Sequence, residues 1–268
     1  MFRALTIAGS DSCGGAGIQA DLKSFSANGV YGMSVITAVT CQNTMGVFGV
    51  QDINPEIIES QINVIFDDIR VDAIKIGMVS KIESIKAIAN SLNKMEKLPP
   101  VVLDPVMISK SGFNLLSKDA KETLVEELFP LATLVTPNLP EAEEILGREI
   151  KNLDDMKEAA LKLKELGPKC VLVKGGHLEG ESTDLLFDGE NFSWLKQERI
   201  NTKNTHGTGC TLSSAIAANL AKGMNMQDAV KEGKRYITCA IEHGFELGKG
   251  VGPTNHFYEL YKKAGMID

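Results

Sequence analysis

The chain contains 268 residues, 43% of them hydrophobic, and has a net charge of −7 from 28 basic and 35 acidic side chains. This length and hydrophobic content are enough for a substantial core in one large domain or two small ones. Because the balance is acidic and no basic run occurs, the composition argues against binding to DNA or RNA.

Three features bear on the compartment in which the protein works. The stretch MFRALTIAGSD has only a brief apolar run before Asp11, so it does not predict a signal peptide. Residues 24–51 carry no charge, but polar residues and glycines interrupt any membrane-spanning pattern, and we expect a buried strand followed by a loop there. The five scattered cysteines form no CxxC pair. The sequence therefore predicts a cytoplasmic protein without a membrane partner, rather than one with a disulfide framework or a zinc site.

Short β-branched runs alternate with helical patterns along the chain. Strands are predicted at RALTIAG, VITAV, DAIKIG, VVLDPV, TLVTPN and CVLVKGG, with a hairpin over 184–200 that turns at DGEN. Helices are predicted over 15–28, 55–69, 81–93 and 117–129, in two acidic segments before Gly167, and over 209–222 and 225–247. This βαβ series predicts an α/β fold in which helices cover both faces of a mostly parallel sheet, as a single domain over 1–268. Ligands are expected at the carboxyl ends of the strands.

The segment THGTGCTLSSAIAANLAKG, residues 205–223, places glycines and a thiol at the start of an apolar helix. The first N–H groups of a helix lack intrahelical partners and present partial positive charge, which favours anions. Gly207 and Gly209 leave room for such an anion, and the same field favours the thiolate of Cys210 at neutral pH. The alternative is a glycine-rich turn that leads into a core helix with a buried, inert thiol.

The segment GSDSCGGAGIQAD, residues 9–21, resembles a dinucleotide-binding fingerprint between a strand and a helix. That fingerprint needs an acidic residue about 20 positions further on to hold a ribose. No acidic residue occurs between Asp21 and Asp52, so we interpret the glycines as backbone that approaches a small ligand, and a dehydrogenase stays the alternative. Neither glycine pair with Walker A spacing is followed by lysine, so any ATP is bound without a P-loop.

Two carboxylates and one lysine follow predicted strands. Asp104 in VLDPV and Glu141 in TPNLPEAEEIL suit a magnesium ion held through water. For Glu141 the alternative is an acidic residue that only stabilises the first turn of a helix. Lys174 in VKGGH is placed to contact a phosphate, or else it is a solvated lysine at a strand end. The histidines have no metal-ligand spacing, and we interpret all four as structural or incidental: His177, His206, His243 and His256.

Several of these segments together resemble one enzyme family. They are GSDSCGGAGIQADLKSFSANGVYGMSVITAVTCQNT, KIGM, VVLDPVMISKSG, LVTPNLPEAEEIL, VKGGH, NTKNTHGTGCTLSSAIAANLAKG and VGPTNHF. This nearly end-to-end pattern is similar to the hydroxymethylpyrimidine and phosphomethylpyrimidine kinases of thiamine biosynthesis, in the ribokinase-like superfamily. The resemblance implies a homodimer that uses ATP and Mg²⁺ to phosphorylate 4-amino-5-hydroxymethyl-2-methylpyrimidine, and then its monophosphate to the diphosphate.

The resemblance also implies roles for individual residues. Most ribokinase-like enzymes carry an aspartate as general base where this chain has Cys210, and in this branch the thiol takes that role. The anion hole for the transferred group would be formed by Gly207, Thr208, Gly209 and Cys210. The metal and phosphate region would contain Asp104, Glu141, Lys174 and, in the SKSG loop, Lys110.

A pyridoxal kinase of the same branch is the nearest alternative, and Gln42 separates the two. A primary amide offers an acceptor and a donor side by side, which can pair with the amino group and adjacent ring nitrogen of the pyrimidine. Pyridoxal has no such amino group, and a site built for paired hydrogen bonds rejects analogues that leave it unsatisfied. The pyrimidine pocket is expected to contain Gly9, Asp21, Gln42 and Met78. A non-enzymatic pyrimidine sensor is a further alternative, which the retention of Cys210 with both carboxylates disfavours.

Overall fold

The computed structural model describes residues 1–107, 116, 118–176 and 182–267, and joins nine strands of these residues into one sheet. The sheet order is β3-β2-β1-β4-β5-β6-β7-β8-β9. Strands β1, β2, β4, β5, β6 and β7 are parallel, whereas β3 and β8 pair antiparallel with their neighbours. The strands are β1 (Arg3–Asp11), β2 (Tyr31–Asn43), β3 (Gly46–Asp52), β4 (Ala73–Ile76), β5 (Val101–Leu103), β6 (Leu134–Val135), β7 (Cys170–Val173), β8 (Ser182–Phe187) and β9 (Phe192–Gln197).

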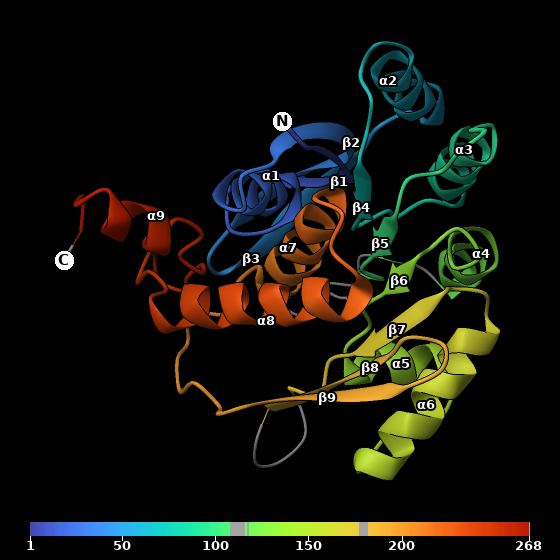
Figure 1. Ribbon diagram of the computed structural model, residues 1–268. Coiled ribbons are helices and arrows are strands. Elements are labelled where there is room, and N and C mark those ends of the chain that lie inside the picture. Colours follow the sequence, from blue (N-terminus) through green and yellow to red (C-terminus); the bar gives the residue numbers. More distant parts are fainter. Residues whose placement is uncertain (108–115, 117, 177–181, 268) are drawn as a thin grey trace.

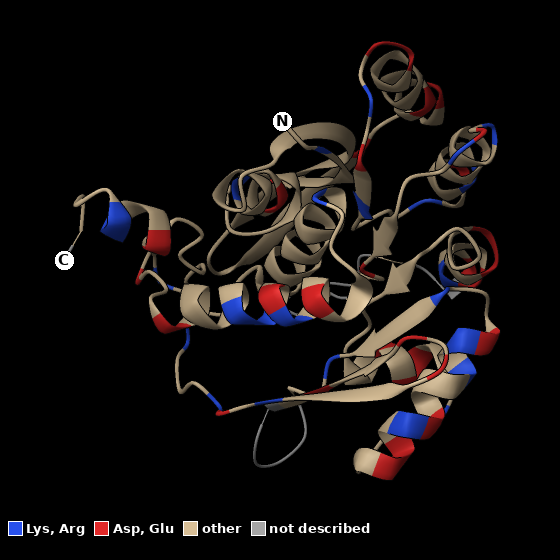
Figure 2. Ribbon diagram, viewed as in Figure 1, with Lys and Arg blue, Asp and Glu red and all other residues tan. Residues whose placement is uncertain are grey.

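Helices cover both faces of this sheet, as Figure 1 shows. On one face lie α1 (Gly17–Ala27), α7 (Thr208–Ala221) and α8 (Met226–Glu242). On the other lie α2 (Pro55–Asp68), α3 (Ile82–Asn93), α4 (Lys118–Leu128), α5 (Leu139–Leu146) and α6 (Leu153–Glu165). A short helix, α9 (Tyr258–Lys263), follows near the C-terminus. Figure 2 shows charged residues along α6 and α8, while α7, which has no charged residue, packs between the sheet and α8.

Alternation along the strands divides the core into two apolar clusters. In β4, Ile74 and Ile76 belong to the cluster under α2 and α3, whereas Ala73 belongs to the cluster under α1 and α7. Lys75 shares the side of Ala73 and is fully buried, so this strand places a charge inside the layer formed by α1 and α7. The predicted architecture of a mostly parallel sheet between two helical layers is confirmed.

Most predicted elements are confirmed, with three differences. The expected loop after VITAV is wrong, because β2 runs on to Asn43 and β3 returns beside it, so the uncharged segment is a strand pair. The last long helix ends at Glu242 rather than 247, and Gly244 beyond its end packs against Asn204. Helix α9 was not predicted from the sequence. Of the helices in the described ranges, none has the length and apolar content that a membrane span needs.

The chain order of the strands determines where a ligand can enter. β1 pairs with β2 on one side and with β4 on the other. The chain therefore first moves from β1 to one side of the sheet and later returns to the other side of β1. In parallel α/β sheets such a reversal opens a crevice at the carboxyl ends of the strands. At this edge lie the segment 9–17 and the residues that follow β4, where the sequence predicts the site.

Candidate active site

Two glycine-containing loops interlock at this edge. Gly207 has φ +79°, a conformation that favours glycine, and a Cβ atom there would lie 1.7 Å from the carbonyl oxygen of Gly15. A Cβ atom on Gly15 would lie 2.3 Å from Cδ2 of the His206 ring. Each loop therefore requires glycine in the other, which is a physical reason for GGAG and THGTG to occur in the same chain.

The carboxylate of Asp11 holds the first of these loops. Its oxygens accept hydrogen bonds from the backbone N–H groups of Cys13 at 2.8 Å, Gly15 at 3.0 Å and Ala16 at 2.8 Å, and Nε2 of His206 lies 2.8 Å away. Burial alone would raise the pKa of Asp11, but the hydrogen bond and charge of His206 and the backbone donors lower it overall. Asp11 is therefore ionised at neutral pH.

Asp11, Cys13 and His206 also bring three potential metal-ligand atoms within 4.8 Å of one another. Both Asp11 oxygens already accept hydrogen bonds from the loop, and His206 uses Nε2 for the same carboxylate. A metal ion would have to displace these contacts, so we interpret the group as a clamp that holds the two loops together.

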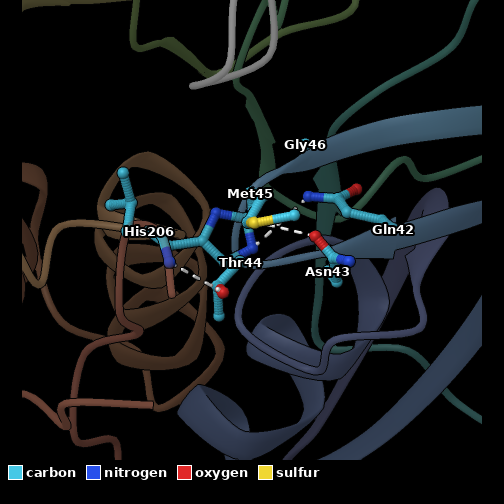
Figure 3. Close-up of a pocket in the computed structure, with 8 residues that line it drawn as sticks. Gln42, Asn43, Thr44, Met45, Gly46 and His206 are labelled. Carbon is cyan, nitrogen blue, oxygen red and sulfur yellow. Dashed lines mark hydrogen bonds between the residues drawn. The ribbon is translucent and has the colours of Figure 1, made fainter. Parts of the chain in front are cut away.

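A hollow of about 260 Å³ opens beside this clamp. It is lined by residues 42–46 at the β2–β3 turn, by His206 and by residues 250–251. Figure 3 shows the His206 ring directed towards the turn, with the Gln42 side chain close by. The backbone of Gln42 is fixed by Ser12, whose Oγ donates to the Gln42 carbonyl oxygen at 2.7 Å and accepts from its N–H at 2.9 Å. Gln42 is thus the one residue of the predicted pyrimidine pocket that lines this hollow.

A charged group occupies the other half of the edge. Asp104 is 1% exposed and forms a 2.8 Å ion pair with Lys174 from the end of β7. The Thr136 hydroxyl donates to Asp104 at 3.1 Å, and the Ser213 hydroxyl on α7 lies 3.4 Å from it. A Cβ atom on Gly209 would lie 3.2 Å from Oδ2 of Asp104 and 3.4 Å from Nζ of Lys174. The start of α7 therefore borders directly on this carboxylate and ammonium.

Glu141 lies next to this pair and also caps a helix. Its side chain accepts from the N–H of Asn138 at 2.8 Å, and its own N–H donates to the Asn138 side chain at 2.9 Å, which completes a capping box at α5. Burial, opposed by the Lys174 charge and assisted by the Asp104 charge, raises the pKa of Glu141 to about 7. Glu141 therefore does stabilise the first turn of a helix, as the sequence-based alternative expects. Its place near Asp104 is also compatible with the predicted role as a magnesium ligand.

The predicted thiolate at Cys210 is wrong. Burial raises the pKa of Cys210 to about 11, and the charges of Asp21 and Asp104 act in the same direction. The Lys75 ammonium and the N–H of Gly17 lower the pKa without offsetting these effects. Burial therefore outweighs the groups that favour the thiolate, and Cys210 is protonated at neutral pH.

The model of the phosphomethylpyrimidine kinase family matches residues 11–255. The chain belongs to this family. A hydroxymethylpyrimidine/phosphomethylpyrimidine kinase of Rhizobium meliloti is 53% identical, and the match covers 97% of this chain and 98% of the relative. Two solved structures are similar as well: a Clostridium difficile phosphomethylpyrimidine kinase, at 54% identity, 89% and 98% coverage and TM-score 0.80, and an ADP complex of Bacillus subtilis pyridoxal kinase, at 43% identity, 97% and 99% coverage and TM-score 0.89. They confirm the ribokinase-like fold.

The other residues predicted for the pyrimidine pocket of this phosphomethylpyrimidine kinase family member lie in different places. Gly9 and Met78 are neighbours, since a Cβ atom on Gly9 would lie 3.2 Å from the Met78 sulfur. Asp21 is fully buried, and accepts hydrogen bonds from Thr6 and Ser214, at 2.6 Å each, and from Lys75 at 2.9 Å. Its carboxylate neutralises the buried lysine, and its contact with the substrate stays a prediction. Lys110 and His177 lie outside the described residues.

Sequence reasoning missed three side chains of this family member's site. His206 was interpreted as incidental, although its place next to the glycines of THGTGC was a usable signal. Asp11, at the end of β1, gave no signal separate from the glycine loop. Lys75 has a charge within the apolar run AIKI, which was the sign of a buried ion pair, here with Asp21 at 2.9 Å. Each of the three depends on a partner distant in the sequence.

Proposed function

We propose that this chain transfers a phosphoryl group from ATP to 4-amino-5-hydroxymethyl-2-methylpyrimidine, and a second one to the resulting monophosphate. The observation that carries this proposal is the Gln42 amide, which lines the hollow beside His206 in a member of the phosphomethylpyrimidine kinase family. An amide matches the paired donor and acceptor of an aminopyrimidine, and the hollow of about 260 Å³ suits a single small ring.

In this proposal the start of α7 and Lys174 stabilise the transferring group. Phosphoryl transfer depends mainly on positioning and on neutralising the negative charge of the transferred oxygens. The N–H groups of Gly209 and Cys210, in the first turn of α7, supply donors, and the Lys174 ammonium beside Gly209 supplies positive charge. These groups neutralise the charge without forming a covalent bond to the phosphorus.

Cys210 is proposed as the base that receives the proton of the acceptor hydroxyl. With a pKa of about 11 it is a strong base once deprotonated, but only a small fraction is thiolate at neutral pH. The Lys75 ammonium, paired with Asp21 in the layer below, favours the thiolate and opposes the effect of burial. Burial therefore limits how much thiolate is present, and Lys75 increases that fraction.

Asp104 and Glu141 are proposed as the residues that hold Mg²⁺. Both offer carboxylate oxygens, the ligands that this cation prefers, and the Asp104 charge contributes to the raised pKa of Glu141. A site in which one carboxylate disfavours ionisation of the next has negative charge that a divalent cation would offset, so the donor set fits. The ion would supply charge neutralisation at the phosphates.

Pyridoxal kinase activity is the second candidate, because the Bacillus subtilis relative of known structure is a pyridoxal kinase with 43% identity to this chain. The test is ADP release by purified protein with the pyrimidine alcohol, with pyridoxal and without an acceptor. We expect turnover with the pyrimidine to exceed that with pyridoxal by at least about 100-fold in kcat/KM, since pyridoxal leaves the amide unpaired. The reverse order would assign pyridoxal as the substrate, and no acceptor-dependent release would contradict both.

We also propose that the protein is a cytoplasmic homodimer and that residues 1–268 act as one kinase domain. Strands from residues 3 to 197 join a single sheet, which supports one domain. Exposed apolar side chains on β2 and β3 or their connecting turn, Val39 at 45%, Met45 at 54% and Phe48 at 67%, offer a surface for a second copy. Light scattering coupled to size-exclusion chromatography should give twice the 29.0 kDa chain mass, and Phe48→Lys should shift it towards monomer.

A further inference from the structure

The Gln42 amide has two polar neighbours whose own hydrogen bonds are already committed. Its Nε2 atom lies 3.4 Å from Nε2 of His206, and its Oε1 atom lies 3.3 Å from the Thr40 hydroxyl. Oxygen and nitrogen of a side-chain amide exchange places when the group turns by 180°, and the hydrogen-bond network decides between the two orientations. His206 and Thr40 therefore determine how this amide is presented.

His206 offers no lone pair on Nε2 to Gln42. Its Nε2 atom lies 2.8 Å from Oδ2 of Asp11, whose lowered pKa keeps it ionised and therefore an acceptor only. The hydrogen of the ring must then be on Nε2, because a lone pair there would face a negative charge. This single hydrogen is directed at Asp11, so Nε2 has no lone pair for the NH₂ group of Gln42, whereas an amide oxygen at that place can share the N–H with Asp11.

Thr40 faces Gln42 as an acceptor. Its hydroxyl has one hydrogen, which it donates to the carbonyl oxygen of Ser10 at 2.8 Å. The 3.3 Å contact with Gln42 is longer, so that side of the hydroxyl offers a lone pair. A lone pair is matched by the NH₂ group of Gln42 and opposed by its oxygen. Both neighbours thus favour the same orientation.

We propose that the Asp11–His206 pair and Thr40 fix the Gln42 amide with its oxygen towards His206 and its nitrogen towards Thr40, and thereby select the acceptor by the order of its hydrogen-bonding groups. An amide oxygen has two lone pairs and the nitrogen has two hydrogens, so one of each stays free for a ligand. His206 is then a positioning residue that sets specificity through Gln42. This inference rests on the proposed pyrimidine substrate and deepens it.

The consequence is discrimination between two nearly identical rings. The 4-amino pyrimidine presents a donor beside a ring-nitrogen acceptor, whereas the 4-oxo analogue presents an acceptor beside a ring N–H. In the same pose the 4-oxo ring requires the amide to turn, which directs its NH₂ at the His206 N–H and its oxygen at the Thr40 lone pair. Mismatched polar groups in a partly enclosed site reduce affinity by about 10- to 100-fold.

The preference for the 4-amino ring over the 4-oxo ring can be measured as a ratio of dissociation constants. Isothermal titration calorimetry without nucleotide gives the dissociation constants of the 4-amino and 4-oxo compounds for wild type, His206→Leu and His206→Gln. We expect wild type to prefer the 4-amino ring by about 100-fold and His206→Leu to lower that preference at least about tenfold, because its amide turns freely. His206→Gln retains a donor and should keep most of the preference. In the Gln42→Met background, His206→Leu should not change the ratio.

The outcomes separate this inference from the function on which it rests. Equal loss of affinity for both rings in His206→Leu would overturn it, since it would show that His206 only holds the loops together. Wild type that binds neither ring and releases no ADP would remove the proposed function and the substrate selection with it. The amide orientation has its own test without substrate: ¹⁵N NMR should find the His206 hydrogen on Nε2 at pH 7, and a hydrogen on Nδ1 alone would refute it.

Discussion

The half of the site that contains Gln42 and His206 differs from the half that contains Asp104 and Lys174 in how its side chains are held. The first half has one ionised group, Asp11, saturated by backbone N–H donors and an imidazole. The second half holds the ion pair of Asp104 and Lys174 with Glu141 near it, and the Asp104 charge contributes to the raised pKa values of Glu141 and Lys174. Directed hydrogen bonds, as in the first half, suit the selection of the molecule that accepts the phosphoryl group. Concentrated charge, as in the second half, suits the binding of phosphate and metal.

Removing the cation of the charged half should give the largest effect. We expect Lys174→Met to lower kcat by about 10³-fold or more, because the transferring group loses its ammonium. It should also lower the free energy of unfolding by about 3 kcal/mol, since Asp104 is left buried without its partner. Steady-state ADP release and urea unfolding measure the two effects.

The double variant Lys174→Met, Asp104→Asn is the matched control. It removes both charges of the pair, so stability should largely return while activity does not. A single Lys174→Met variant that unfolds at the wild-type urea concentration would show that the ion pair does not hold this half together.

Cys210→Ser tests where proton transfer matters. An attacking alcohol must lose a proton, so we expect this variant to lose about 10²- to 10⁴-fold in the first phosphorylation. The monophosphate has a second pKa of about 6 and is largely dianionic at pH 7, so the second phosphorylation should fall much less. Single-turnover assays with each acceptor measure the two steps. Equal losses would mean that Cys210 shapes the anion hole instead of accepting a proton.

The pH dependence of the first step gives an independent check. The wild-type rate should rise as pH increases from 7 towards 9, because the pKa of Cys210 is about 11 and the thiolate fraction grows about tenfold per pH unit below it. The Ser variant should lack this rise, and so should the second phosphorylation in wild type. A wild-type profile that is flat above pH 7 would exclude Cys210 as the base.

In the hydrogen-bonded half, Gln42→Met should affect selection more than stability. We expect kcat/KM for the pyrimidine to fall about 100-fold, since both paired hydrogen bonds are lost. The melting temperature should change by less than about 3 °C, because Met fills a similar volume and Ser12 still binds the backbone of residue 42. Steady-state kinetics and thermal unfolding are compared. Unchanged pyrimidine kinetics would reopen pyridoxal as the substrate.

Glu141→Gln should have the smallest effect and sharpens the role of charge. The magnesium concentration for half-maximal rate should rise severalfold, because a carboxylate ligand becomes neutral. The helix cap should survive, since a Gln oxygen can also accept the N–H of Asn138. Magnesium titration curves that overlay those of wild type would leave Glu141 as a capping residue only.

The same variant should show a pH-dependent gain in stability. The folded-state pKa of Glu141 is raised from 4.5 to about 7. Its favourable contribution to the free energy of unfolding is therefore fully present below pH 4.5 and is lost as the pH rises through 7. The Gln variant avoids this loss. Its advantage over wild type should therefore be near zero at pH 4.5 and reach on the order of 2 kcal/mol, or about 5 °C, above pH 7. Paired melting curves across this range measure it.

The sequence predicted the layered fold because strand and helix periodicities are local signals. It missed β3, since GVFGVQD has two glycines and no continuous apolar run, and only the pairing with β2 makes it a strand. Asp104 and Lys174 were predicted from their places at strand ends. The pairing of His206 with Asp11, and of Lys75 with Asp21, was not predicted, because each pair forms only when distant segments meet.

The loop clamp has a consequence for synthesis on the ribosome. Asp11 and His206 are 195 positions apart in the chain, and the two loops that they join require one another's glycines. Long-range contacts of this kind are made late in folding. A nascent polypeptide that has exposed only its first strands and helices therefore contains Gln42 without the imidazole that orients it. The acceptor site is completed only once residue 206 has emerged, so we expect the pyrimidine to bind the finished chain and not the nascent one.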